Sequence, residues 1–116
     1  MNIPINPVPK PRMTQSDKWK KRPAVMRYHQ YKDELHLLVR GDLEPTFTVV
    51  FNVQMPKSWS NKKKEEMEGK PHQQKPDIDN YLKAFMDALC VDDSYVYDVR
   101  AIKRWSKVGS IELSEG

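Results

Sequence analysis

Hydrophobic side chains recur with the period of an α-helix in two segments of the chain. In residues 24–40, aromatic and aliphatic residues are spaced three and four apart: Tyr28, Tyr31, Leu35 and Leu38. A second series with similar spacing follows Asp79: Leu82, Phe85, Met86 and Leu89. Such spacing places each series on one face of a helix. The pattern predicts a first helix over 24–40, ended by Gly41, and a second from Asp79 to about Cys90, capped by Asp79 or Asn80.

Alternation with a period of two predicts strands in three other segments. Residues 46–55, "TFTVVFNVQM", place Phe47, Val49, Phe51 and Val53 on one face, which we expect in the core. The segments "SYVYDVRAIKRW" (94–105) and "SIELS" (110–114) flank the short "SKVG". They predict two antiparallel strands joined by a turn. Residues 56–76 contain few apolar residues, which indicates an exposed connection with a short helical turn in "NKKKEEMEG".

These elements predict a small α/β domain of the α+β type, with a mixed or antiparallel sheet packed against two main helices. The chain has 116 residues, the size of one domain, and we expect residues 1–116 to form a single unit. The opening segment to about Arg22 contains four prolines: Pro4, Pro7, Pro9 and Pro11. Because proline has no amide proton for a sheet, this arm can supply at most a short edge strand.

Charge is distributed unevenly along the chain, although the net charge is only +4. Residues 1–32 carry eight lysines and arginines against Asp17, whereas residues 77–98 carry six aspartates against Lys83. A basic arm beside an acidic centre indicates a polyanionic partner, together with chemistry that needs cations.

Cysteine content and hydropathy exclude several classes of protein. Cys90 is the single cysteine, so an internal disulfide and a cysteine-rich zinc site are both excluded. No apolar run reaches the roughly 20 residues of a membrane span, and the opening prolines do not suit a secretory signal. We therefore expect a cytoplasmic protein that has no membrane partner.

The acidic centre contains a motif, "KPDIDNYLKAFMDALCVDD" in residues 75–93. Asp77 and Asp79 stand at the entrance of the second predicted helix, where the positive end of the helix dipole favours negative charge. Lys83 lies four residues after Asp79, in position for a helical ion pair with it. These structural roles explain each residue alone. If Asp77 and Asp79 instead converged with Asp92 or Asp93, their carboxylates would form a site for a hard divalent cation such as Mg²⁺. Both interpretations stay open at this level.

The combination of residues resembles the RusA family of Holliday junction resolvases, small endonucleases of bacteria and their phages. The likeness rests on "KPDIDNYLKAFMDAL", "DDSYV" and Lys103, with weaker matches in "PVPKPRM" and "MPKSWSNKKKE". The chain departs from the family pattern at Tyr81, where leucine is common. It also has only Val91 between Cys90 and the double aspartate, a shorter loop than many members have.

The resemblance implies a magnesium-dependent endonuclease, with Mn²⁺ as a possible substitute and no organic cofactor. By position in the motif, Asp77, Asp79 and Asp93 are expected to be the catalytic metal ligands, with Asp92 as the alternative to Asp93. Lys83 is the expected catalytic lysine. The implied reaction is paired, symmetric nicking of four-way DNA junctions by a homodimer in recombination and repair. The alternative is a noncatalytic module that binds branched DNA, if the short acidic loop leaves the metal site incomplete.

Four basic residues are candidate DNA contacts. Lys10 and Arg12 lie in the proline-rich arm, which would lose little entropy on docking, although a solvated arm is the competing interpretation. Lys75 directly precedes the acidic motif and Lys103 lies on the strand that follows it. The family resemblance supports DNA contacts for both.

Overall fold

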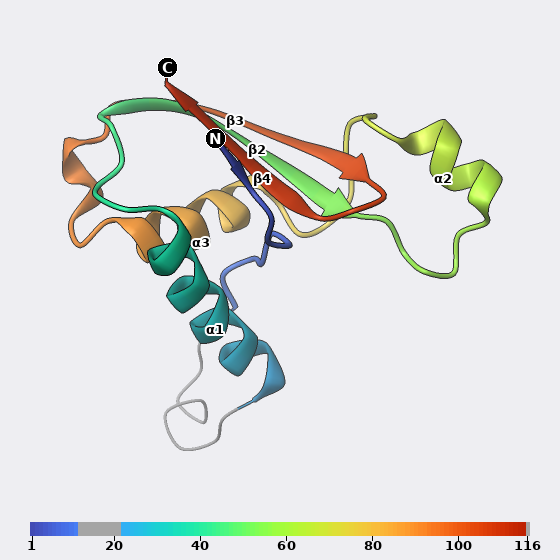
Figure 1. Cartoon of the computed structure of the whole chain (residues 1–116), viewed down its shortest axis with the longest axis horizontal. Helices are drawn as coiled ribbons and strands as arrows, with labels where there is room; N and C mark the ends of the chain where they lie inside the picture. Colours follow the sequence, from blue (N-terminus) through green and yellow to red (C-terminus); the bar gives the residue numbers. More distant parts are fainter. Residues whose placement is uncertain (12–21, 116) are drawn as a thin grey trace.

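A four-stranded mixed sheet with helices on one face forms the body of the protein (Figure 1). The computed structural model describes residues 1–11 and 22–115. The strands are β1 (Asn2–Ile3), β2 (Thr46–Gln54), β3 (Asp98–Ser106) and β4 (Ser110–Glu115). The helices are α1 (Pro23–Leu38), α2 (Asn61–Met67) and α3 (Ile78–Leu89), with a short 3₁₀ helix, η2, at Asp93–Tyr95. The α+β class, the mixed sheet and the short edge strand in the arm are as predicted.

The sheet order is β1-β4-β2-β3, and it corrects one prediction. The segments that contain β3 and β4 were expected to pair as a hairpin, but β2 lies between them. It pairs in parallel with β3 and antiparallel with β4. The reason is that α3 crosses over one face of the sheet and returns the chain beside β2 in parallel, as a helical crossover does. The turn after β3 then carries the chain past the end of β2 to its other side.

The core lies between the sheet and the helices α1 and α3. Phe47, Val49 and Phe51 project from β2 and are almost completely buried. Phe51 stacks on Tyr81 of α3, with ring centroids 5.5 Å apart, and meets the edge of Phe85 at 6.0 Å. The burial of alternate residues in β2 therefore confirms the predicted strand face. On α3, Phe85 and Leu89 are buried as predicted, whereas Leu82 and Met86 are only partly buried and the remaining buried positions are taken by Tyr81, Ala84 and Ala88.

The predicted boundaries of α1 and α3 were wrong by one or two residues, and in each helix this changes which residue takes a particular role. In α1 the helix stops at Leu38, which is 47% exposed, and the capping residue Val39 takes the core position instead. In α3 the helix begins at Ile78, so its N-cap residue is Asp77 rather than Asp79 or Asn80.

α2 lies within the connection between β2 and α3 and stands away from the body of the protein (Figure 1). None of its residues is buried, as predicted for an exposed connection containing a short helical turn. Glu68, just after the helix, fastens it to the end of β3 by accepting hydrogen bonds from Ser106 Oγ (3.4 Å) and the Lys107 amide (2.7 Å).

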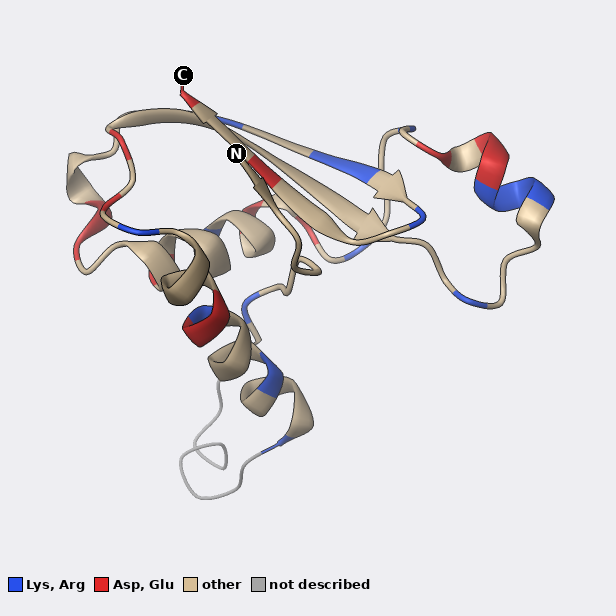
Figure 2. Ribbon diagram, viewed as in Figure 1, with Lys and Arg blue, Asp and Glu red and all other residues tan. Residues whose placement is uncertain are grey.

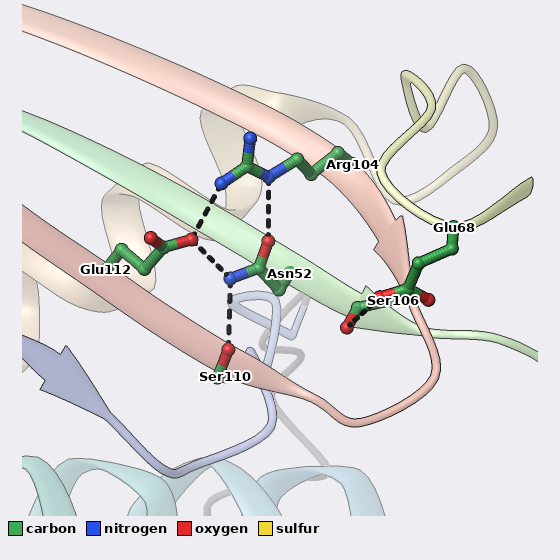
Figure 3. A network of polar contacts seen from close by, with 6 residues as sticks. All are labelled: Asn52, Glu68, Arg104, Ser106, Ser110 and Glu112. Atoms are coloured by element: carbon green, nitrogen blue, oxygen red, sulfur yellow. Dashed lines mark hydrogen bonds and ion pairs between the residues drawn. The ribbon is translucent and has the colours of Figure 1, made fainter.

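The other face of the sheet carries a polar network (Figure 3). Asn52 Nδ2 donates to Ser110 Oγ at 3.0 Å and to Glu112 Oε2 at 2.8 Å, while Arg104 donates to Asn52 Oδ1 and Glu112 Oε2. These hydrogen bonds, first from Asn52 and then from Arg104, lower the pKa of the Glu112 carboxyl. The network joins β2, β3 and β4 and gives the buried Asn52 amide partners for both of its polar atoms.

Candidate metal and DNA site

Asp77 and Asp79 lie together at the N-terminal end of α3. Asp77 is the N-cap residue, yet its side chain makes no capping hydrogen bond, and Asp79 follows in the first helical turn. Both side chains are exposed, and neither has a hydrogen-bond or ion-pair partner among residues 1–11 and 22–115. The free amides and the positive end of the helix dipole favour negative charge here. The two carboxylates therefore keep their oxygens available for a cation.

Lys83 lies one turn beyond Asp79 on α3 and is exposed. The helical ion pair with Asp79, one of the two interpretations of this spacing, is not formed, and Lys83 is in no ion pair with another described residue. Its ammonium group is thus not committed to a structural contact, and it stands near the same end of the helix as the two carboxylates.

Asp92 and Asp93 follow the opposite end of α3 and differ in what their carboxylates do. Asp92 caps η2, because its Oδ1 accepts a hydrogen bond from the Ser94 amide at 3.0 Å, and this bond lowers the pKa of the Asp92 carboxyl. Asp93 has no side-chain partner among the described residues. The capping role of Asp92 favours Asp93 as the residue with free oxygens.

Tyr95 fastens η2 to the rest of the fold. Its hydroxyl donates to the Leu43 carbonyl at 2.7 Å and lies 3.6 Å from Cys90 Sγ, so η2 is held against the end of α3 and the loop before β2. The hydrogen bond with Cys90, followed by burial, raises the pKa of Tyr95 to about 12. The acidic loop is therefore attached at the end of the helix where Cys90 lies.

The structure does not bring the two acidic pairs together within one chain. α3 has 12 residues and, at a rise of roughly 1.5 Å per residue, spans about 18 Å. Three residues separate Leu89 from Asp93, and the four steps of this connection cover at most about 14 Å even when fully extended, less than the length of α3. Figure 2 shows acidic residues at both ends of α3. Among the described residues, no three acidic, histidine or cysteine side chains are grouped to hold a metal.

Lys10, expected to contact DNA, is attached to α3 in this structure. Its ammonium forms an ion pair with Asp87 Oδ2 at 2.6 Å, and its amide donates to the Asn80 carbonyl at 3.2 Å. Asp87 also accepts a hydrogen bond from the Tyr28 hydroxyl at 3.1 Å. Sequence reasoning missed Asp87 as this anchor, although its place in the acidic motif was a signal. Arg12, the second candidate in the arm, lies outside the described residues.

Lys75 and Lys103 lie at the loop that leads into Asp77. Lys75 is exposed and its side chain has no partner among the described residues. Lys103, half-buried on β3, donates from Nζ to the carbonyls of Gln74 at 2.8 Å and Pro76 at 2.9 Å. Lys75 is therefore free to reach a phosphate, whereas two of the three N–H donors of Lys103 are already used.

The fold and the site first define a class: a small α+β protein in which free carboxylates at a helix end stand beside lysines. The chain also matches the family model of endodeoxyribonuclease RusA over residues 4–114, and it therefore belongs to the RusA family. Comparisons with the curated proteins and with the solved structures gave no match.

Membership of the RusA family implies the nuclease activity of a Holliday junction resolvase, which acts on branched DNA junctions. Nucleases of this family generally depend on a divalent metal. Within residues 1–11 and 22–115, no helix has the length and apolar character needed to cross a membrane.

Proposed function

We propose that the protein is a magnesium-dependent endonuclease that resolves four-way DNA junctions by paired symmetric nicks. It acts in the cytoplasm during recombination and repair of bacterial, phage or prophage DNA. One observation carries the proposal. A chain of the RusA family presents two exposed carboxylates, Asp77 and Asp79, which have no partner among the described residues. Lys83 stands one turn further along the same helix.

These residues fit a magnesium site because Mg²⁺ binds through one or two carboxylates and fills its remaining positions with water and substrate phosphate. Asp77 and Asp79 would hold the ion, and Mn²⁺ would substitute for it. When bound, the cation lowers the pKa of water and offsets negative charge on the phosphate. Lys83 adds a fixed positive charge where the phosphodiester gains negative charge during hydrolysis.

We assign the third acidic position to Asp93, supplied by the second chain of a homodimer. Two observations support this assignment: Asp93 is free of side-chain partners, and the length of α3 separates it from Asp77 and Asp79 of its own chain. A two-fold dimer also suits a junction whose two equivalent strands are cut at equivalent positions. In this arrangement each site takes its carboxylate pair from one chain and Asp93 from the other.

Basic residues near Asp77 and Asp79 support the proposal that the partner is DNA. Lys75 lies two residues before Asp77 and is exposed, so we assign it a phosphate contact, and Arg12 in the arm is a second candidate. Lys10 is a weaker candidate because its ammonium is paired with Asp87. These contacts would position the DNA without reading its sequence.

The separation of Asp93 from the pair favours one other function, a noncatalytic module that binds branched DNA. A cleavage assay distinguishes the endonuclease from the noncatalytic module. A labelled four-way junction and a linear duplex with the same arm sequence are incubated with the protein in Mg²⁺, Mn²⁺ or EDTA. The endonuclease nicks the junction in either metal and leaves the duplex intact. Junction binding without any nicking would identify the noncatalytic module.

A further inference from the structure

Lys103 lies on the helix-facing side of the sheet, beside the start of α3. On β3 it is the register partner of Phe51, whose ring is completely buried and stacks on Tyr81 of α3. Paired residues on neighbouring strands project from the same face. The Lys103 side chain therefore extends between the sheet and the loop that enters α3, which accounts for its half-buried state.

The ammonium of Lys103 binds that loop at two points. Its hydrogen bonds to the carbonyls of Gln74 (2.8 Å) and Pro76 (2.9 Å) flank Lys75, and Asp77 is the next residue. No carboxylate among the described residues pairs with Lys103. Backbone carbonyls alone thus hold the charge in place, and the charge stands close to Asp77.

Backbone hydrogen bonds attach the preceding part of the loop to the same strand. The Trp105 amide donates to the Lys70 carbonyl at 2.9 Å, and the His72 amide donates to the Lys103 carbonyl at 3.1 Å. The His72 ring is buried and packs on Trp105 with ring centroids 4.3 Å apart. Burial, followed by the charge of Lys103, lowers the pKa of His72. Between His72 and Asp77, no backbone hydrogen bond joins the described loop to β3, and the Lys103 side chain continues the attachment.

From this geometry we propose that Lys103 is a positioning residue, which holds the turn at Gln74–Pro76 so that Asp77 and Asp79 are presented together at the start of α3. The inference rests on the proposed function of these carboxylates and replaces the expected DNA contact of Lys103. It also assigns Lys75, between the two bound carbonyls, to the outward side of the turn.

The test compares Lys103→Met with the wild type in three measurements, with Lys107→Met as the matched control. Lys107 is exposed, and its side chain has no partner among the described residues. The carbonyl ¹³C shifts of Gln74 and Pro76, recorded without metal or DNA, report the two hydrogen bonds. Manganese titration of the free protein reports the carboxylate pair. Junction binding in EDTA at several salt concentrations reports phosphate contacts.

For Lys103→Met we expect both carbonyl signals to move upfield and Mn²⁺ affinity to fall on the order of 10-fold, as when an outer contact of a metal ligand is lost. The salt slope of junction binding should stay at the wild-type value, whereas Lys75→Met should make it shallower by about one unit. Lys103→Arg, which keeps the charge and the donors, should restore part of the Mn²⁺ affinity.

The opposite results overturn the proposal. Removal of positive charge alone would tighten Mn²⁺ binding, so unchanged or tighter binding by Lys103→Met contradicts a positioning role. If the salt slope of Lys103→Met is as shallow as that of Lys75→Met, Lys103 contacts DNA phosphate. If the carbonyl signals do not move, the two hydrogen bonds of Lys103 are absent. If the wild type binds Mn²⁺ but does not cut junctions, the proposed function fails while the positioning of the carboxylates is still measured.

Discussion

At the scale of the residue, the main feature of the site is an N-cap aspartate without a capping bond. A carboxylate at this position commonly accepts an amide hydrogen bond of the first turn, and Asp77 does not. Asp79 and Lys83, four residues apart, likewise form no ion pair. The exposed side chains of Asp77, Asp79 and Lys83 therefore contribute little to stability, and these three residues are open to substitution without loss of the fold.

We expect Asp77→Asn and Asp79→Asn each to reduce junction cleavage by about 100-fold or more, because each removes ligand charge while preserving side-chain shape. Junction binding in EDTA should be retained, since repulsion between the protein and DNA decreases. Asp33→Asn on α1 is the control, because Asp33 is exposed and has no side-chain partner among the described residues. Near-normal cleavage by either variant would remove that aspartate from the site.

Lys83→Ala should lower the single-turnover rate by roughly 100- to 1000-fold, the range for loss of one preorganised electrostatic contact. Thermal unfolding should stay close to that of the wild type, because the exposed ammonium has no ion pair to lose. Lys83→Arg should recover activity only in part, since a planar guanidinium places charge differently. Full activity of the alanine variant would leave Lys83 as a solvated residue on the helix surface.

At the scale of the element, α3 connects the site to the basic arm. The arm residue Lys10 binds Asp87 on this helix, and Asp87 also accepts from Tyr28 of α1. The contact thus joins three segments that are distant in the sequence. It assigns Lys10 to attaching the arm, although the sequence indicated a phosphate contact.

For Lys10→Ala we expect an unchanged salt slope of junction binding, because the ammonium is paired with Asp87 rather than with phosphate. A double-mutant cycle with Asp87→Asn should give a coupling below about 1 kcal/mol, since the pair is partly exposed. The measurements are mobility-shift titrations at several salt concentrations and denaturant unfolding. A slope shallower by about one unit would show that Lys10 contacts DNA.

Local patterns predicted the elements better than their pairing. Alternation in β2 and the helical spacing in α3 identified both elements, because each pattern follows from which face is buried. The hairpin prediction was wrong because turn residues between two strands do not say whether a third strand enters between them. β2 enters there because it buries Phe47, Val49 and Phe51 against the helices, at the centre of the sheet.

At the scale of the whole molecule, the sequence could not predict where Asp93 lies relative to Asp77 and Asp79. The motif spacing correctly predicted that Asp77, Asp79 and Lys83 lie together, since they share one helix end. Whether Asp93 joins them depends on the route of the chain after α3, and the short connection leaves it at the far end. A site shared between two chains follows if all three aspartates act together.

Heterodimers test the shared site. If Asp93 acts across the dimer, a heterodimer of Asp79→Asn and Asp93→Asn subunits keeps one complete site, so it should nick one strand of a junction. Each homodimer of these variants should be inactive, and so should the heterodimer of Asp77→Asn and Asp79→Asn subunits, the matched control with damage in both sites. The subunits are tagged differently and purified in tandem. An inactive Asp79→Asn and Asp93→Asn heterodimer would contradict the shared site.

The most direct test of the central claim is single-turnover cleavage of an end-labelled synthetic four-way junction, with the nicks mapped on all four strands. We predict that the wild type with Mg²⁺ nicks two opposite strands at symmetric positions. We predict no nicks in EDTA and a rate for Asp79→Asn lower by about 100-fold or more. Cleavage without a divalent metal, or an Asp79→Asn rate equal to that of the wild type, would contradict a metal-dependent resolvase built on these carboxylates.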